Sequence, residues 1–354
     1  MELLRETIAA IQPQDPKWRE RAKRRLQDLT MPHWALGRLM DLAVDLAGIT
    51  RSMKPKTSRR VVVVMAGDHG VVEEGVSKYP QEVTAQMVMN FLKGGAGINA
   101  LARVARAKVV VVDMGVRNEI AHVPPGASFL RKKVAPGTKN MAQEPAMSRQ
   151  EAIEALETGI SIAMDLASRF HLLAAGDMGI GNTTPSAAIL SVMAGASPHE
   201  VTGRGTGLED HELQRKILVV ERAILANRPD PSDPIDVLAK VGGLEIGGIA
   251  GFFLGCARAR RPVLVDGFIS TAGAVIAKGL CPASLDYMIA SHRSAERGHR
   301  LALEYLGLKP LLDLDLRLGE GTGAALAMPL VEAASRILTE VATFDEARVS
   351  RASH

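Results

Sequence analysis

The amino-acid sequence predicts an α/β fold built on a mostly parallel, doubly wound sheet. Four short apolar segments, each followed by glycine or an acidic residue, have the composition of strands buried on both faces. Long helix-like segments alternate with them, which implies right-handed crossovers between parallel strands. Because ligands bind beyond the carboxyl ends of such strands, the residues after each strand are the first candidates for a functional site.

The strands and helices alternate over residues 56–284, which we expect to form a large domain that carries phosphate-binding loops. Residues 1–55 and 285–345 lack Val-rich strands and have a helical pattern. They predict a smaller, discontinuous helical domain made from both chain ends, followed by a tail over residues 346–354. The predicted strands are residues 61–66, 108–112, 171–175 and 262–265, and the predicted helices include 80–106, 148–169, 186–194 and 211–226.

A stripe of glycines marks one further helix. Gly243, Gly247, Gly251 and Gly255 recur every four residues, so they lie on one helical face. Each glycine lowers the stability of a helix by about 1 kcal/mol, so we expect the close approach of another part of the chain to compensate. The pattern favours tight packing on another helix or on the sheet; the alternative is a helix start that lies near a ligand.

Composition excludes several classes of function. Aromatic residues make up only 3% of the 354 residues, which argues against a base-stacking surface for nucleic acid. The net charge of +4 suits small anionic substrates rather than a polyanion. The longest apolar stretch, residues 246–257, is too short to cross a membrane. With two cysteines that lack metal-ligand spacing, we expect a cytoplasmic protein without a bound metal.

The segment GDMGIGNTTP (176–185) is the richest candidate site. It follows an apolar strand and precedes a helix. Closely spaced glycines let backbone N–H groups converge, Asn182 and Thr183 add donors, and the helix adds its positive N-terminal end. It matches neither a Walker loop nor a GxGxxG fingerprint. The residues therefore indicate a phosphate site or, alternatively, a plain tight turn.

Two other glycine-rich segments could bind or act on a ligand. Gly203, Arg204 and Gly205 could wrap an anion, with Lys216 as a nearby point charge, or form a flexible loop. Glu320 lies between two glycines, so little bulk shields its carboxylate. Such a group can act as a general base, although most acids in glycine-rich turns are solvated or cap a helix.

Two segments containing histidine complete the candidates. Asp68 and His69 end the first predicted strand, and hydrogen bonds that shape the loop are favoured over a metal site because no second histidine lies nearby at ligand spacing. Ser291 opens a helix-like segment in a pattern close to a capping box. His292 could instead face a substrate.

Six long motifs appear in one order over nearly the whole chain. They are DHGVVEEGVSKYPQEVTAQM (68–87), GDMGIGNTTPSAA (176–188), DVLAKVGGLEIGGIAG (236–251), VLVDGF (263–268), SHRSAE (291–296) and RLGEGTGAALAMP (317–329). Together they resemble the nicotinate-nucleotide:dimethylbenzimidazole phosphoribosyltransferase family. Several independent motifs make this resemblance far more specific than a lone glycine loop.

The resemblance implies a three-layer α/β/α domain with a Rossmann-like sheet, a smaller helical domain and a homodimer. It implies transfer of ribose 5-phosphate from nicotinate mononucleotide to 5,6-dimethylbenzimidazole or a related base. The products would be alpha-ribazole 5′-phosphate, for the nucleotide loop of cobalamin, and nicotinate. No cofactor is expected, because nicotinate leaves as a neutral pyridine nitrogen and needs neither an acid nor a metal.

The resemblance also implies roles for individual residues. Glu320 matches the catalytic glutamate and would accept the proton of the attacking base. The base would lie in a pocket with Glu320 at its floor, and the glycine loops would hold the ribose phosphate. The expected substrate-binding residues are Asp177, Gly179, Ile180, Gly181, Asn182, Thr183, Gly203, Arg204, Gly205, Lys216, Tyr79, Met87, Met178, Leu318 and Ser291.

The chain departs from the family pattern at several positions. Some members carry Ser and Gln where Tyr79 and Met87 stand, so the pocket here is bulkier and less polar. Some have Glu at Asp177, and residues 31–37 differ from a common KPxGSLG. The alternatives are the same transfer to another acceptor, such as adenine or a phenol, and a non-catalytic nucleotide-binding regulator. A dehydrogenase is disfavoured because no GxGxxG follows the first strand.

Overall fold

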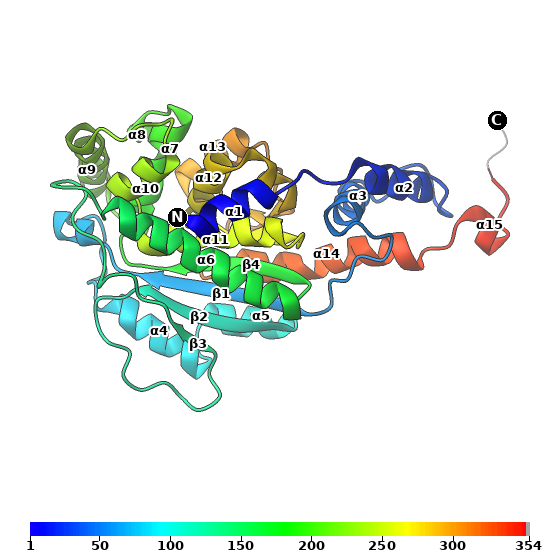
Figure 1. Cartoon of the computed structure of the whole chain (residues 1–354), viewed down its shortest axis with the longest axis horizontal. Coiled ribbons are helices and arrows are strands. Elements are labelled where there is room, and N and C mark those ends of the chain that lie inside the picture. The colour runs from blue at the N-terminus through cyan, green and yellow to red at the C-terminus, as the bar shows by residue number, and fades with distance from the viewer. Residues whose placement is uncertain (352–354) are drawn as a thin grey trace.

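The computed structural model describes residues 1–351 and has the predicted parallel sheet at its centre (Figure 1). The main sheet of these residues has the strand order β3-β2-β1-β4-β5-β6, and every neighbouring pair is parallel. This is the order of a Rossmann-like sheet, in which the crevice for a ligand lies where the order reverses, beyond β1 and β4. The strands are β1 (Arg60–Gly67), β2 (Ala107–Gly115), β3 (Phe129–Arg131), β4 (Leu172–Met178), β5 (Val263–Val265) and β6 (Met288–Ala290), with β7 (His292–Arg293) and β8 (Leu312–Asp313) in a separate pair.

Strand β1 shows how the sequence builds the layers. All of its residues are buried, because alternate side chains enter two different cores. Val61 and Val63 pack into one core with residues of α6 and α11, while Val62 and Val64 pack into a second core with residues of α5 and α14. The fold is therefore the expected three-layer α/β/α arrangement.

The helices follow local signals in the sequence. For example, α6 begins with a capping box, in which Ser148 and Glu151 each bond to the other's backbone N–H. The α-helices of the described residues are α1 (Glu2–Ala10), α2 (Pro16–Gln27), α3 (Arg38–Thr50), α4 (Val83–Lys93), α5 (Gly97–Val104), α6 (Arg149–Arg169), α7 (Thr183–Ala194), α8 (Pro198–Val201), α9 (Asp210–Asn227), α10 (Pro234–Val241), α11 (Leu244–Arg258), α12 (Phe268–Leu280), α13 (Arg297–Leu306), α14 (Thr322–Glu340) and α15 (Phe344–Ala347), with 3₁₀ helices at η1 (Gly70–Glu74) and η2 (Pro282–Tyr287).

The four predicted strands are confirmed as β1, β2, β4 and β5. The single helix predicted over residues 80–106 is wrong, because two helices, α4 and α5, occupy that range. Gly94 ends α4 in a left-handed conformation with φ +81°, which glycine adopts without a steric penalty. The break matters for the site, because it points a new helix N-terminus, that of α5, toward the carboxyl ends of the strands.

The glycine stripe of α11 serves packing. A Cβ added at Gly251 would overlap the carbonyl of Leu156 in α6, and one added at Gly255 would lie 2.6 Å from Ala163 Cβ. Helix α6 also uses a glycine, Gly159, against the backbone of Gly248. The predicted close packing on another helix is thus confirmed, and it brings α6 and α11 into backbone contact over the sheet.

The two chain ends meet, but they do not separate cleanly from the rest. Leu29 forms an isolated antiparallel bridge with Thr343, and α2 and α3 pack on α14, which places these helices together at one end of the molecule (Figure 1). However, β6 is the edge strand of the main sheet, α13 packs on α12, and α1 packs on α6 and α11. The division into two domains stays a prediction, and residues 352–354 of the predicted tail lie outside the described residues.

No helix in the described part of the chain combines the length and apolarity that a membrane crossing requires. Cys256 and Cys281 are both buried free thiols.

Candidate active site

A cavity of about 550 Å³ lies at the carboxyl ends of β4 and β5. This is the edge of the sheet at which the fold predicts a ligand. Segments from widely separated parts of the sequence contribute to its walls. Of the residues expected to bind substrate or catalyse, those that line it are Tyr79, Met87, Asp177, Met178, Gly179, Ile180, Gly181, Asn182, Thr183, Gly205, Leu318 and Glu320.

Glu320 occupies a constrained turn on the cavity wall. Gly319, Glu320 and Gly321 all have positive φ, of +80°, +62° and +87°. For a residue with a side chain, a left-handed backbone costs roughly 1–2 kcal/mol, so the surroundings must hold it in place. Strand β4 packs directly against the turn, because a Cβ added at Gly176 would overlap the backbone of Glu320 and Gly321.

The Glu320 carboxylate is 5% exposed and is oriented by another part of the chain. Its Oε2 atom accepts a 3.1 Å hydrogen bond from the backbone N–H of Ile98 in the first turn of α5. Burial raises the pKa of this carboxyl, while the Ile98 N–H acts in the opposite direction and nearby Asp266 adds to the rise. A carboxylate with a raised pKa is a stronger base than an ordinary glutamate, which suits proton abstraction.

Asp177, at the end of β4, is a second carboxyl group on the cavity wall. Its Oδ2 atom accepts a 3.0 Å hydrogen bond from Asn182, and its Oδ1 atom is buried without a partner among the described residues. Burial, reinforced by the charge of Asp266, raises the pKa of Asp177 to about 8. At neutral pH this group is therefore protonated and able to donate a hydrogen bond.

The predicted glycine loop joins β4 to α7 across the cavity from the Glu320 turn. Gly181 takes φ +87°, and the Ile180 N–H donates to Thr84 Oγ1 at 3.1 Å, which fixes the loop against α4. Helix α7 begins at Thr183, so its N-terminal backbone N–H groups lie at the cavity wall. A helix N-terminus behind a glycine loop favours an anionic group such as a phosphate.

Lys216 links the two predicted anion-binding segments. It is fully buried in α9, and its Nζ atom lies 2.6 Å from Thr183 Oγ1 and 3.2 Å from the carbonyl of Gly203. Burial lowers the pKa of Lys216 to about 8, with Glu296 acting in the opposite direction. The ammonium group therefore lies directly behind the first residue of α7, where it adds to the positive potential of the helix end.

The structure does not bring four of the expected residues to the cavity wall. Lys216 stays behind Thr183, and Gly203 and Arg204 line an adjoining hollow of about 410 Å³. Arg204 is engaged with Asp210 and with the carbonyl of Leu208. Its guanidinium is therefore held within its own loop.

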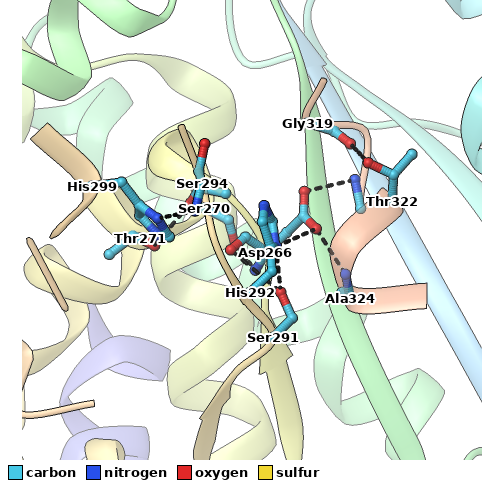
Figure 2. Close-up of polar contacts among 12 residues, drawn as sticks. Asp266, Ser270, Thr271, Ser291, His292, Ser294, His299, Gly319, Thr322 and Ala324 are labelled. Atoms are coloured by element: carbon cyan, nitrogen blue, oxygen red, sulfur yellow. Dashed lines mark hydrogen bonds and ion pairs between the residues drawn. The ribbon is translucent and has the colours of Figure 1, made fainter. Parts of the chain in front are cut away.

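Ser291 is the fourth of these residues, and it lies behind the Glu320 turn rather than in front of it. Its fully buried hydroxyl contacts His292 Nδ1 at 2.9 Å and the carbonyl of Asp266 (Figure 2). The reason is that Ser291 follows the edge strand β6, and its backbone N–H donates to the carbonyl of Val265 in β5, which holds it beside Asp266. Ser294, three residues later, lines the cavity instead.

Several residues of the cavity were not identified from the sequence. They are Val76, Ser77, Val83, Thr206, Gly267, Phe268, Ile269, Ser294, Glu296 and Arg317. Most of these residues follow strands or belong to the quoted motifs. Their position in the sequence, rather than their residue type, could have identified them. Glu296 Oε2 is buried without a partner among the described residues, an unusual state for a carboxylate. No feature of the sequence near Ile98 predicts its contact with Glu320.

The loop at Asp68 and His69 is structural, as the sequence favoured. His69 Nε2 lies 2.7 Å from Glu245 Oε1 and both side chains are buried. Burial alone would lower the pKa of His69, but Glu245 and Asp68 together raise it. Within residues 1–351, no group of three or more His, Cys, Asp or Glu side chains is arranged to hold a metal ion.

Comparison with known proteins assigns the chain to a family. A phosphoribosyltransferase family model matches residues 11–349. The protein named nicotinate-nucleotide–dimethylbenzimidazole phosphoribosyltransferase in Syntrophotalea carbinolica is 59% identical over 351 residues, covering 99% of both chains. The protein of the same name in Desulfotalea psychrophila is 55% identical, again over 99% of both. The crystal structure of the Thermus thermophilus enzyme superposes with a TM-score of 0.90 at 50% identity, covering 96% of this chain and 100% of that one.

Proposed function

This chain belongs to the phosphoribosyltransferase family that includes the nicotinate-nucleotide–dimethylbenzimidazole phosphoribosyltransferases, and we propose that it carries out their reaction. The proposed reaction transfers ribose 5-phosphate from nicotinate mononucleotide to 5,6-dimethylbenzimidazole or a related base. It yields nicotinate and alpha-ribazole 5′-phosphate, the nucleotide that completes the lower ligand of cobalamin.

One observation carries the proposal. A single cavity has a buried carboxylate, Glu320, on one wall and a glycine loop with a helix N-terminus, Gly179–Thr183, on another. The first can take a proton from an aromatic base, and the second can hold a phosphate. A volume of about 550 Å³ is in the usual range for a small-molecule site.

The phosphate of nicotinate mononucleotide would bind at the N-terminus of α7. The backbone N–H groups of Gly181 and Thr183 would donate to its oxygens, because those of Ile180 and Asn182 already donate to Thr84 Oγ1 and to the Gly179 carbonyl. The ammonium of Lys216 would supply a full positive charge behind Thr183. Binding the phosphate at a fixed point orients C1′ of the ribose toward the acceptor base. Orientation of this kind provides a large part of the rate enhancement.

The acceptor base would lie above Glu320 against apolar side chains. Met87, Met178 and Leu318 line the cavity, and Tyr79 lies at its mouth. Tyr79 and Leu318 are 55% and 61% exposed, values that are high for large apolar side chains in the absence of a bound molecule. A flat aromatic base would cover them.

The chemistry follows from the position of Glu320. The bond between C1′ and the pyridine nitrogen breaks, and its electron pair remains on that nitrogen, which becomes neutral. One nitrogen of the benzimidazole forms the new bond to C1′, and the proton on its other nitrogen passes to Glu320. Because Oε2 is bound to the Ile98 N–H, Oε1 is the oxygen that accepts this proton. Attack on the face opposite to nicotinate converts a β-glycosidic bond into an α-glycosidic bond.

Asp177 would act as a donor rather than as a competing base. With a pKa of about 8 it keeps its proton at neutral pH, and its Oδ1 atom has no partner among the described residues. A neutral carboxylic acid at this point can donate a hydrogen bond to the bound ribose or base. Glu320, whose Oε2 atom is held by the Ile98 N–H, then remains as the base of the site.

The apolar walls also support a second acceptor. Met87 has no hydrogen-bonding amide and Tyr79 has only a hydroxyl, so these two walls of the pocket make few demands on the polar groups of the base. We therefore propose that bases other than 5,6-dimethylbenzimidazole, including adenine or a phenol, compete as acceptors. A regulator without turnover is the remaining alternative.

We further propose that the protein is a cytoplasmic homodimer. The two thiols are free and buried, as in a reducing compartment, and the resemblance to the family implies two subunits. Sedimentation equilibrium of the purified protein tests the subunit number. A monomer over the micromolar range would refute the dimer but leave the catalytic proposal standing.

The decisive experiment is a product assay. The protein is incubated with nicotinate mononucleotide and an equimolar set of benzimidazole, 5,6-dimethylbenzimidazole, adenine and phenol, and the products are identified by mass. We expect α-linked ribotides and stoichiometric nicotinate. Binding of nicotinate mononucleotide without any ribotide would instead support the regulator.

A further inference from the structure

A buried carboxylate lies directly behind the Glu320 turn. Asp266 follows β5, is 1% exposed and does not line the cavity. Both of its oxygens bond to the backbone of the turn: Oδ2 accepts from the Gly321 N–H at 3.1 Å and Oδ1 accepts from the Ala324 N–H at 2.8 Å (Figure 2). One side chain therefore satisfies two of the backbone N–H groups at the start of α14, groups that have no partner within the helix.

These bonds hold a conformation that the turn would not adopt alone. Three successive residues with positive φ, of which Glu320 is not a glycine, need external support. Strands β1 and β4 supply steric support, since a Cβ added at Gly321 would overlap Val62 and one added at Gly176 would overlap Glu320. Asp266 supplies polar support from the third side.

Asp266 is itself held in place. Its backbone N–H donates to Ser270 Oγ at 3.2 Å, and Ser270 Oγ donates to the carbonyl of Ala175 in β4. His292 Nδ1 lies 3.9 Å from Oδ1, and the imidazole fits only because residue 323 is glycine, where an added Cβ would overlap the ring. The carboxylate is thus fixed relative to β4, to β7 and to the first turn of α14.

We propose that Asp266 is a positioning residue for Glu320, which holds the Gly319–Thr322 turn so that the Glu320 carboxylate faces the acceptor base. Asp266 does not touch substrate and acts only through Glu320. This inference rests on the proposed function, because it takes Glu320 as the catalytic base.

The charge of Asp266 has a second effect on the same reaction. Burial raises the pKa of Asp266, while His292 and the Ala324 and Gly321 N–H groups favour its charged form. When charged, it raises the pKa of Glu320. The other ionisable groups that face this region are Asp177 on β4, which is protonated below a pKa of about 8, and His292 after β6. The acid limb of turnover is therefore expected to respond to the charge of Asp266.

The test compares Asp266→Asn with the wild type. The amide NH₂ of asparagine is a donor and would face one of the two backbone N–H groups, which are also donors. That hydrogen bond is lost and the turn loosens, although the side-chain volume is almost unchanged. We expect kcat to fall about 10²-fold, the effect of a misplacement of roughly 1 Å, with KM for nicotinate mononucleotide within about threefold. The acid limb of the kcat profile should also move to lower pH, because a nearby negative charge that raises the pKa of Glu320 is gone.

Two comparisons separate positioning from loss of stability. Ser335→Ala removes a buried hydroxyl that donates to the carbonyl of Pro55 at 2.6 Å, toward the other end of α14 from the turn, and should leave kcat and its pH profile unchanged. In a Glu320→Gln background, Asp266→Asn should lower kcat no further, because a residue that acts through Glu320 has nothing left to position.

The outcomes are separable. A wild type that forms no ribotide refutes the proposed function, whereas an active wild type with an equally active Asp266→Asn refutes only the positioning role. If Asp266→Asn does not fold, Ser270→Ala is measured instead, since it removes only the hydroxyl that bonds to the Asp266 N–H. A fall in kcat of about threefold to tenfold supports the role, and an unchanged kcat overturns it.

Discussion

The backbone N–H of Ile98 donates a 3.1 Å hydrogen bond to Oε2 of Glu320, a residue 222 positions later in the chain. The N–H belongs to the first turn of α5, whose start is created by the glycine break after α4. The bond occupies one carboxylate oxygen and leaves the other to a substrate. It also places the positive end of a helix beside the catalytic carboxylate, which offsets part of the effect of burial on its pKa.

Glu320→Gln should abolish most turnover without disturbing the fold. The amide oxygen can still accept from Ile98, but glutamine cannot take a proton from the attacking base. We expect kcat to fall about 10²–10⁴-fold, the usual value of general-base assistance, while nicotinate mononucleotide binds as before. Steady-state kinetics and calorimetric titration measure the two quantities. A variant with near wild-type kcat would remove Glu320 from the role of base.

Asp177→Asn should change how stability depends on pH. The Asp177 carboxyl has a pKa of about 8 in the folded protein and an ordinary value of 3.8 when unfolded. Between these values only the folded state holds the proton, so its contribution to the free energy of unfolding falls as pH rises from about 4 to 8. The amide has no proton to lose, so the variant should lose less stability than the wild type over this window. If the Tm of the wild type and the Tm of the variant fell equally from pH 5 to 8, the raised pKa of Asp177 would be contradicted.

Lys216→Gln should weaken binding of nicotinate mononucleotide more than it slows turnover. Removing a buried charge behind the phosphate site should raise KM about 10-fold to 10²-fold, the range for a hydrogen bond to a charged group. Because burial lowers the pKa of Lys216 to about 8, wild-type KM should itself rise above that pH as the ammonium loses its proton. The variant should lack this rise.

A matched control for this substitution is Lys139→Gln, an exposed lysine that pairs with Glu144. It should leave KM unchanged at every pH. An equal rise of KM in both variants would show that the effect is not specific to Lys216, and would argue against a phosphate site beside Thr183.

The double substitution Tyr79→Ser with Met87→Gln should alter the choice of acceptor. It adds hydrogen-bonding groups to two walls of the base site and removes bulk at its mouth. We expect the relative kcat/KM to shift toward bases with more polar edges, by about 10-fold or more. The ratio is measured by competition among benzimidazole, 5,6-dimethylbenzimidazole and adenine. Unchanged ratios would show that these side chains do not contact the base.

The fold class and more than half of the residues that line the cavity could be predicted from the sequence. Short apolar segments, each followed by glycine or an acidic residue, predicted the inner strands, because a sheet covered on both faces buries such segments. Residues such as Asp177 and Glu320 could be named as candidates because they follow a strand or stand between glycines. The short edge strands β3 and β6, of three residues each, carried no such pattern and were missed.

The contacts that orient the side chains of the site are visible only in the folded chain. The contacts that orient Glu320 come from Ile98 and Asp266, which are distant in sequence and have no motif in common with it. Ser291 and Ser294 belong to one motif, yet only Ser294 reaches the cavity, because Ser291 is held against β5 and His292 by its own hydrogen bonds. The local sequence pattern predicts strands, helices and turns. The burial, charge and hydrogen bonds of a side chain such as Glu320 depend on segments that meet only when the chain folds.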